Sequence, residues 1–273
     1  MTVDAPSSTP KTSEAPILSC QGIEKSFLGV KAVNGATFDV TKGLITALIG
    51  PNGAGKTTVV NILSGAMKSD AGHMQIGGED VTNWDNAKIA RMGLMRTFQL
   101  SRELGGLTVL ENLLVAPKNQ AGEKLFDIFF CPGRVKREER TNIERAAGIL
   151  QTYGLYELRD ARAKELSGGQ KKLLEIARGV MASPSILLLD EPMAGVNPAL
   201  IDRIGGHILD LKNQGVSILM IEHNLNVVEK ICDNVIVLAE GKTLATGKLS
   251  ELRANPEVVQ AYLGEVIDAS THS

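Results

Sequence analysis

Short apolar runs alternate with helical periodicity in the second half of the chain. The runs at 186–189, 217–221 and 235–238 have the length of strands, and amphipathic segments at 199–213 and 225–232 separate them. Continuous apolar strands joined by amphipathic helices are typical of a largely parallel sheet that helices cover on both faces. We therefore predict an α/β core for this part of the chain.

The first part of the chain adds further strands to this core. Strand-like patterns occupy residues 17–24 and 36–40, and the turn-prone pair Leu28-Gly29 lies between them. Residues 44–49 form a buried-strand run that ends in a glycine-rich loop, and a helical pattern follows at 57–66.

The middle of the chain has a different pattern. From about residue 91 to residue 182 the apolar positions recur mostly at the spacing of amphipathic helices. We predict an inserted α-helical subdomain here, and a short helix at 256–263 near the end of the chain. The predicted single domain spans 17–268, with its core at 17–90 and 183–247, the helical subdomain at 91–182, C-terminal helices at 248–268, a disordered tail at 1–16 and a short tail at 269–273.

Composition is that of an ordinary globular protein. Hydrophobic residues make up 43% of the chain, charged residues 22%, and the formal net charge is −2, so nothing predicts binding to nucleic acid or to an anionic membrane surface. Cys20, Cys131 and Cys232 lie far apart and offer no disulfide framework, as in a reducing cytosol. No apolar run approaches the roughly 20 residues needed to span a bilayer. Any membrane role would therefore require a partner.

A glycine-rich loop follows the apolar run at 44–49. It reads Gly50-Pro51-Asn52-Gly53-Ala54-Gly55-Lys56-Thr57-Thr58 and satisfies the pattern G-x-x-x-x-G-K-[ST]. Glycines let backbone N–H groups close around phosphate oxygens, and the N-terminus of the following helix adds positive potential. We expect Lys56 to reach the β- and γ-phosphates of ATP and the Thr57 hydroxyl to bind Mg²⁺. The alternative, an ordinary glycine turn, is disfavoured because the loop joins a buried strand to a helix.

Two carboxylates end the apolar run at 186–189. The carboxyl ends of parallel strands line the ligand crevice, so Asp190 and Glu191 are expected beside the glycine-rich loop. Adjacent strand residues point to opposite sides, which allows two roles. Asp190 suits Mg²⁺, directly or through a water, and Glu191 suits the general base that activates the attacking water. Without the phosphate loop, such a pair would more simply begin a solvated loop.

A second glycine motif precedes the helical pattern at 171–181. It reads Leu166-Ser167-Gly168-Gly169-Gln170, in which Ser167 is a suitable N-cap and the glycines leave N–H groups unshielded at a helix start. One nucleotide needs only one phosphate-binding loop, so a second glycine motif is not explained by the first site. A capped helix alone would not require all five of these residues in this order. The set of motifs resembles the ATP-binding subunits of ABC transporters, in which L-S-G-G-Q is the diagnostic signature. The resemblance covers about residues 17–264.

This resemblance implies a fold and a mode of assembly. The fold would be a P-loop NTPase (RecA-like) core with a mainly parallel sheet, an antiparallel β-subdomain and an inserted α-helical subdomain. The signature residues would contact the γ-phosphate held by the phosphate loop of a second ATPase subunit, so that ATP joins two subunits head to tail as a homodimer or heterodimer. These residues are Ser167, Gly168, Gly169 and Gln170.

The remaining family motifs follow in the expected order. Gln99 matches the Q-loop glutamine, which contacts Mg²⁺ and relays the nucleotide state to the membrane partner. His223 matches the switch histidine, which would hydrogen-bond the γ-phosphate and orient the water with Glu191. Phe27 resembles the aromatic residue that stacks on adenine, although tyrosine is commoner there and a core phenylalanine is the alternative. Asn197 stands where the D-loop of the family usually has aspartate, which leaves its contact with the partner subunit open.

Three short segments and the insertion indicate which kind of ABC transporter the chain resembles. Residues 174–178, 191–198 and 259–265 are similar to the ATPases of branched-chain amino-acid importers, and residues 117–140 resemble the longer insertion of the larger such subunit. The chain would then hydrolyse ATP to power import through separate integral-membrane permease subunits, supplied by a solute-binding protein. It would be cytoplasmic and peripheral on the inner face of the cell membrane. ATPases for urea or lipopolysaccharide transport remain alternatives, and a non-transport ABC ATPase is a more distant one.

Overall fold

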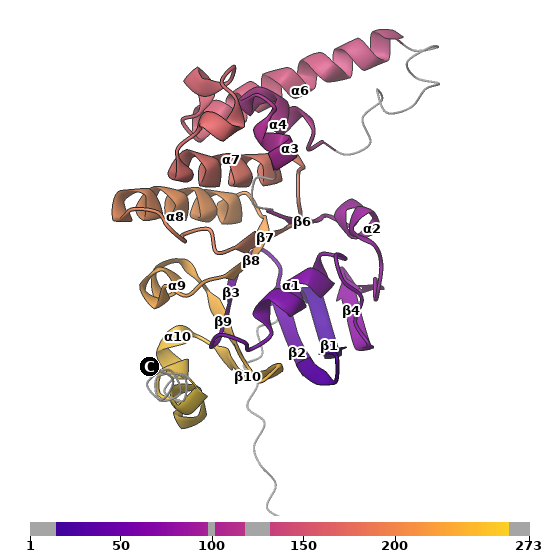
Figure 1. Cartoon of the computed structure of the whole chain (residues 1–273), viewed down its shortest axis with the longest axis vertical. Coiled ribbons are helices and arrows are strands. Elements are labelled where there is room, and N and C mark those ends of the chain that lie inside the picture. The colour runs from indigo at the N-terminus through magenta and orange to yellow at the C-terminus, as the bar shows by residue number, and fades with distance from the viewer. Residues whose placement is uncertain (1–14, 98–101, 118–131, 262–273) are drawn as a thin grey trace, which may run out of the picture.

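The strands form two sheets in the computed structural model, which describes residues 15–97, 102–117 and 132–261 (Figure 1). One sheet is four-stranded with the order β2-β1-β4-β5, and the other is six-stranded with the order β10-β9-β3-β8-β7-β6. The strands are β1 (Pro16–Phe27), β2 (Val30–Thr41), β3 (Ile45–Ile49), β4 (Ala71–Ile76), β5 (Glu79–Asp80), β6 (Leu94–Arg96), β7 (Ile186–Asp190), β8 (Ser217–Ile221), β9 (Asn234–Ala239) and β10 (Lys242–Gly247).

The six-stranded sheet is parallel except at one edge. Strand β3 pairs in parallel with β8 and β9, and β7 pairs in parallel with β8 and β6. Only the edge strand β10 runs antiparallel, beside β9, whereas every pair in the four-stranded sheet is antiparallel. The mainly parallel sheet and the antiparallel sheet are both confirmed.

Alternate residues of the parallel strands enter two different cores. Ile45 and Ala47 of β3 pack in the core shared with α7, α8 and α9, whereas Leu48 packs in the core shared with α1 and the antiparallel sheet. Because both faces of the strand are covered, the sequence is a continuous apolar run and not an alternating one. Each fully buried Leu or Ile side chain contributes roughly 1.5–3 kcal/mol to folding.

Helix α1 (Lys56–Leu63) lies on one face of the parallel sheet, and α8 (Pro198–Asn213) and α9 (Leu225–Ile231) lie on the other. The other helices of the described residues are α2 (Asn86–Arg91), α3 (Arg102–Gly105), α4 (Val109–Leu114), α6 (Pro132–Thr152), α7 (Gly168–Met181) and α10 (Leu249–Leu252), with 3₁₀ turns at Tyr156–Leu158 and Ala163–Glu165. Residues 256–261 are also helical, and the rest of the helix predicted at 256–263 lies outside the described residues. No helix in the described ranges is long and apolar enough to cross a membrane.

Helices α3, α4, α6 and α7 gather at one end of the molecule (Figure 1). Helix α4 packs against α6 and α7, and α6 packs against α7, so the helical insertion has its own interior. Its predicted start at residue 91 is wrong, because β6 (Leu94–Arg96) pairs with β7 and extends the core sheet. A strand of three residues is too short to show a period of its own, so the sequence pattern did not separate it from the helical segments that follow.

Candidate active site

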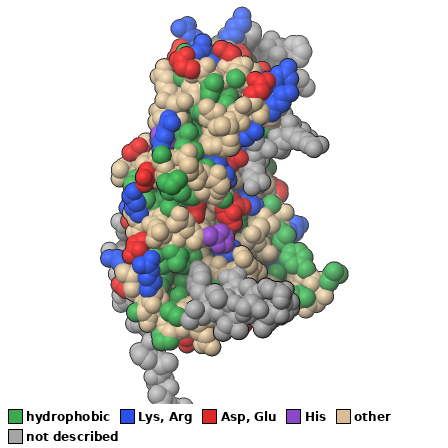
Figure 2. Space-filling view, turned by 60° about the vertical axis from the view of Figure 1, so that its left-hand side comes forward, with side chains coloured by type: hydrophobic (Ala, Val, Ile, Leu, Met, Phe, Trp, Pro, Cys, Tyr) green, Lys and Arg blue, Asp and Glu red, His purple; other side chains and the backbone are tan. Residues whose placement is uncertain are grey.

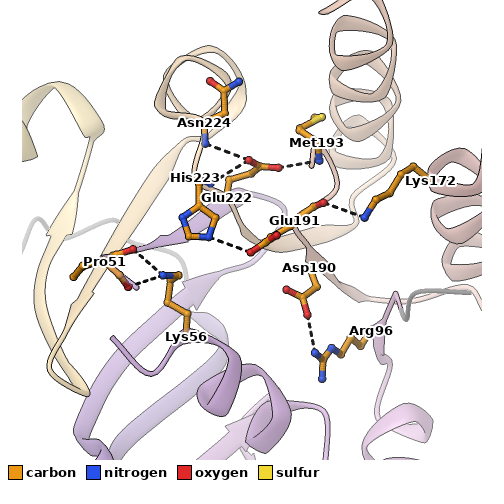
Figure 3. Close-up of polar contacts among 11 residues, drawn as sticks. Pro51, Lys56, Arg96, Lys172, Asp190, Glu191, Met193, Glu222, His223 and Asn224 are labelled. Carbon is orange, nitrogen blue, oxygen red and sulfur yellow. Dashed lines mark hydrogen bonds and ion pairs between the residues drawn. The ribbon is translucent and has the colours of Figure 1, made fainter. Parts of the chain in front are cut away.

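Four parallel strands deliver the candidate groups to one edge of the sheet. In the order β3, β8, β7 and β6, their carboxyl ends lead into the glycine-rich loop, His223, the acidic pair and Arg96. The sequence expectation that the loop and the acidic pair share one edge follows from this parallel order. Figure 3 shows these side chains converging from separate segments of the chain.

The glycine-rich loop adopts a conformation that side chains would disturb. Gly50, Gly53 and Gly55 have φ values of 153°, 76° and 94°. A Cβ at Gly50 would lie 2.0 Å from the carbonyl oxygen of Leu238, and one at Gly55 would lie 2.3 Å from that of Ala32. The backbone therefore passes too close to its neighbours for any residue except glycine at these two positions.

Helix α1 begins at this loop with an uncapped N-terminus. Its N-cap, Gly55, provides no side-chain cap, and the first turn has no acidic residue. The Lys56 ammonium is buried and donates to the carbonyl oxygens of Gly50 and Pro51, at 2.7 and 2.8 Å. A lysine held against the loop and an open helix N-terminus together form an anion-binding concavity.

Glu191 and His223 contact each other across the strand ends. His223 Nε2 lies 3.1 Å from Glu191 Oε1, and the two side chains are 47% and 46% exposed. Figure 2 shows a histidine among acidic side chains on the surface of one face. A carboxylate and an imidazole in contact and open to solvent can hold and orient a water molecule for attack.

Asp190 is the last residue of β7, and its carboxylate is bound by an arginine. Its Oδ2 accepts from Arg96 Nη2 at 2.7 Å, and Arg96 Nη1 donates to Asn61 Oδ1 at 2.6 Å. Thr57 is exposed at the start of α1. The hydroxyl and carboxylate are hard oxygen donors of the kind that Mg²⁺ accepts together with waters and phosphate oxygens. Their chemistry fits this metal.

Sequence reasoning missed three charged residues that support these groups. Arg96 fixes Asp190, the Lys172 ammonium donates to the Glu191 carbonyl at 3.2 Å, and the Glu222 carboxylate accepts from the Met193 N–H at 3.0 Å (Figure 3). Arg96 and Glu222 lie at the ends of strands of the parallel sheet, and this position could have marked them as candidate site residues. Lys172 gave no such signal, because it lies within helix α7 and not at the end of a strand.

The second glycine motif begins helix α7, as predicted. Ser167 is the N-cap, its Oγ accepts from the Gln170 N–H at 3.3 Å, and Gln170 Oε1 accepts from the Ser167 N–H at 2.9 Å. A Cβ at Gly169 would meet the end of the Leu200 side chain at 2.2 Å, while Gly168 has open space. Helix α7 packs on α4, α6 and β7, whereas α1 packs on β2, so the two glycine motifs start helices in different parts of the fold.

The structure describes Phe27 and Asn197, but not Gln99. Phe27 is 43% exposed, which removes the alternative of a core phenylalanine, and the Lys25 ammonium lies 5.8 Å from its ring centroid. Asn197 caps α8 by accepting from the Leu200 N–H at 2.9 Å. Gln99 and most of the 117–140 insertion lie outside the described residues.

Comparison with known proteins decides the family. The ABC transporter family model matches residues 33–194, more than half of the chain. The chain belongs to the ABC transporter ATP-binding family. A model of the branched-chain amino acid ATP-binding cassette transporter also matches residues 242–268.

Named relatives of this ABC family chain are similar over almost their whole length. The probable branched-chain amino acid transport ATP-binding protein LivG of Archaeoglobus fulgidus is 45% identical, over 91% of this chain and 95% of that protein. The high-affinity LivG of Escherichia coli K12 is 40% identical, over 92% and 98%. These relationships make the chain an ABC-type transport ATPase.

Solved structures of ABC cassettes have the same fold. A nucleotide-free ATP-binding cassette from an ABC transporter superposes with a TM-score of 0.80 at 39% identity, covering 91% of this chain and 99% of that one. A cassette in its ADP conformation superposes with a TM-score of 0.77 at 37% identity, covering 92% and 100%. The P-loop NTPase fold expected from the sequence is thereby confirmed.

Proposed function

We propose that this chain is the ATP-hydrolysing subunit of an importer for branched-chain amino acids. The observation that carries the proposal is the contact between Glu191 and His223 at the edge of the sheet that also holds the Lys56 loop. The match to the branched-chain transporter model at 242–268 and the named relatives favour this solute class over urea and lipopolysaccharide.

ATP would bind with its phosphates in the glycine-rich loop. The N–H groups of residues 50–58 and the Lys56 ammonium would hold the phosphate oxygens, and Thr57, Asp190 and Gln99 would hold Mg²⁺. The metal, when bound, supplies positive charge to the phosphates. Glu191 would accept a proton from the attacking water, and His223 would orient that water and hydrogen-bond the γ-phosphate.

A second ATPase subunit would complete the site. Ser167, Gly168, Gly169 and Gln170 start α7 in the helical insertion, away from the helix that follows the phosphate loop of the same chain. The exposed start of α7 would therefore serve the nucleotide held by a partner cassette. The dimer would dock on permease subunits from the cytoplasmic side, with a solute-binding protein supplying solute from the opposite side.

Co-purification tests the transport assignment. The full chain, purified from its native membrane with its bound proteins, is expected to bring down a permease pair, and the assembly in proteoliposomes should couple ATP hydrolysis to uptake of leucine, isoleucine or valine. Uptake of urea instead would contradict the solute class. Ribosomal or DNA-repair partners would contradict transport while leaving the ATPase chemistry in place.

Phe27→Ala should weaken nucleotide binding with little effect on turnover. Stacking of a base on an aromatic ring is worth about 1–3 kcal/mol, so we expect the KM for ATP to rise about tenfold at nearly constant kcat. Phe27→Tyr should behave as wild type. Val30→Ala is the matched control, because Val30 is an exposed apolar residue just beyond the same turn. An unchanged KM in Phe27→Ala would remove Phe27 from the nucleotide site.

A further inference from the structure

A buried carboxylate links the two turns that carry Glu191 and His223. Glu222 directly follows β8 and is 4% exposed. Its Oε1 accepts from the Met193 N–H at 3.0 Å, and its Oε2 accepts from the N–H groups of His223 and Asn224 at 3.1 and 3.3 Å (Figure 3). One side chain therefore bonds to the turn after β7 with one oxygen and to the turn after β8 with the other.

The geometry of both turns matters for the water-activating pair. Glu191 has a φ of 49°, in the left-handed region that non-glycine residues seldom adopt, so its turn needs external support. Its backbone N–H donates to the Ile221 carbonyl at 3.1 Å, and Lys172 donates to its carbonyl. Two residues later, the bond from Met193 to Glu222 fixes the other end of the turn.

Packing alone does not account for a carboxylate at this position. Burial raises the pKa of Glu222, and the N–H groups of Met193, Asn224 and His223 oppose that rise only in part. An apolar side chain of similar volume would fill the space without the desolvation cost. What a carboxylate provides, and an apolar residue lacks, is two acceptor oxygens directed at two separate turns.

We propose that Glu222 is a positioning residue for ATP hydrolysis, which holds the Glu191 turn against the His223 turn through its two carboxylate oxygens. The proposal rests on the proposed function, because it assigns Glu222 to the same hydrolytic centre. Glu222 acts through Glu191 and His223 and is not itself in contact with the reacting atoms.

Glu222→Gln separates positioning from simple space filling. The amide has nearly the same shape, but it offers one acceptor oxygen and one NH₂ group in place of two acceptors. Its oxygen can serve only one turn, so the NH₂ group must face the N–H donors of the other turn. The link between the turns is broken while the side chain still fills its site.

The test is steady-state ATP hydrolysis by the full chain with Mg²⁺, beside thermal unfolding. For Glu222→Gln we expect kcat to fall about ten- to a hundredfold, the size that a small misplacement of reacting groups produces, with the KM for ATP within about twofold of wild type. Ile208→Val, which removes one methylene from the core under α8, is the control for lost stability and should keep the wild-type kcat. A wild-type kcat in Glu222→Gln would overturn the proposal.

A double-mutant cycle with His223→Ala tests the route of the effect. If Glu222 acts through this pair, adding Glu222→Gln to His223→Ala should lower kcat much less than Glu222→Gln alone, whereas full additivity would contradict the proposal. If Glu222→Gln fails to fold, Glu222→Asp replaces it, because aspartate keeps two acceptor oxygens on a shorter side chain. We expect a smaller fall in kcat for this variant, again with the KM for ATP nearly unchanged. Failure of the wild-type chain to hydrolyse ATP would instead overturn the proposed function, and this inference with it.

Discussion

Glu191→Gln is expected to abolish ATP turnover while leaving ATP binding intact. Glu191 is the carboxylate in contact with His223 and is half exposed at the strand ends, where a water molecule can reach it. General-base catalysis contributes about 10²–10⁴-fold to a rate, and glutamine keeps the shape of the side chain but cannot accept the proton. We expect kcat to fall by about that factor.

The same variant should also accumulate as a closed dimer. ATP would remain between two subunits because it is bound but not hydrolysed, so size-exclusion chromatography with Mg²⁺ and ATP should show a dimer for the variant and mostly monomer for wild type. Glu229→Gln, which removes an exposed carboxylate paired with Arg253, is the matched control and should behave as wild type. Wild-type hydrolysis in Glu191→Gln would show that another group is the base.

Lys56→Met is expected to lose nucleotide affinity as well as turnover. The ammonium is buried at the mouth of the loop and is held by the carbonyls of Gly50 and Pro51, so it presents a positive charge where phosphates would bind. Hydrogen bonds to charged groups contribute about 1.5–3 kcal/mol, which corresponds to roughly a ten- to hundredfold weaker Kd. Loss of a donor aimed at developing charge should lower kcat about 10²–10³-fold as well.

Equilibrium binding of a fluorescent ATP analogue and steady-state hydrolysis measure the two effects of Lys56→Met separately. Lys42→Met is the matched control, since Lys42 is an exposed lysine in the turn between β2 and β3. Thermal unfolding of the nucleotide-free chains shows whether the loop itself has been disturbed. Wild-type affinity in a folded Lys56→Met chain would exclude Lys56 from phosphate binding.

The main elements of the fold could be predicted from local patterns. The buried runs that became β3, β7, β8 and β9 are apolar on both faces, a pattern that a covered parallel strand produces by itself. Strand β6 escaped prediction because three residues are too few for a period. The long antiparallel strand β1 extends beyond the predicted 17–24, since pairing with β2 and β4 stabilises residues whose own pattern is weak.

The sequence by itself was enough to predict the chemistry of the candidate site. The glycine-rich loop, the acidic pair and the signature are local strings whose spacing is dictated by phosphate geometry and helix capping, so they can be recognised without a fold. The sequence also placed the glycine-rich loop and the acidic pair at strand ends, and the parallel strand order brings these ends to one edge of the sheet.

Only the tertiary structure decided which groups hold the site in place. Arg96 and Asp190 are 94 residues apart in sequence, Glu222 and Met193 are 29 apart, and Lys172 and Glu191 are 19 apart. Such contacts depend on strand order and on the path of each turn, and no local pattern encodes them. The exposure of Phe27 and the capping role of Asn197 were likewise decided by the tertiary structure, because residue type alone does not fix how a side chain packs or which helix end it caps.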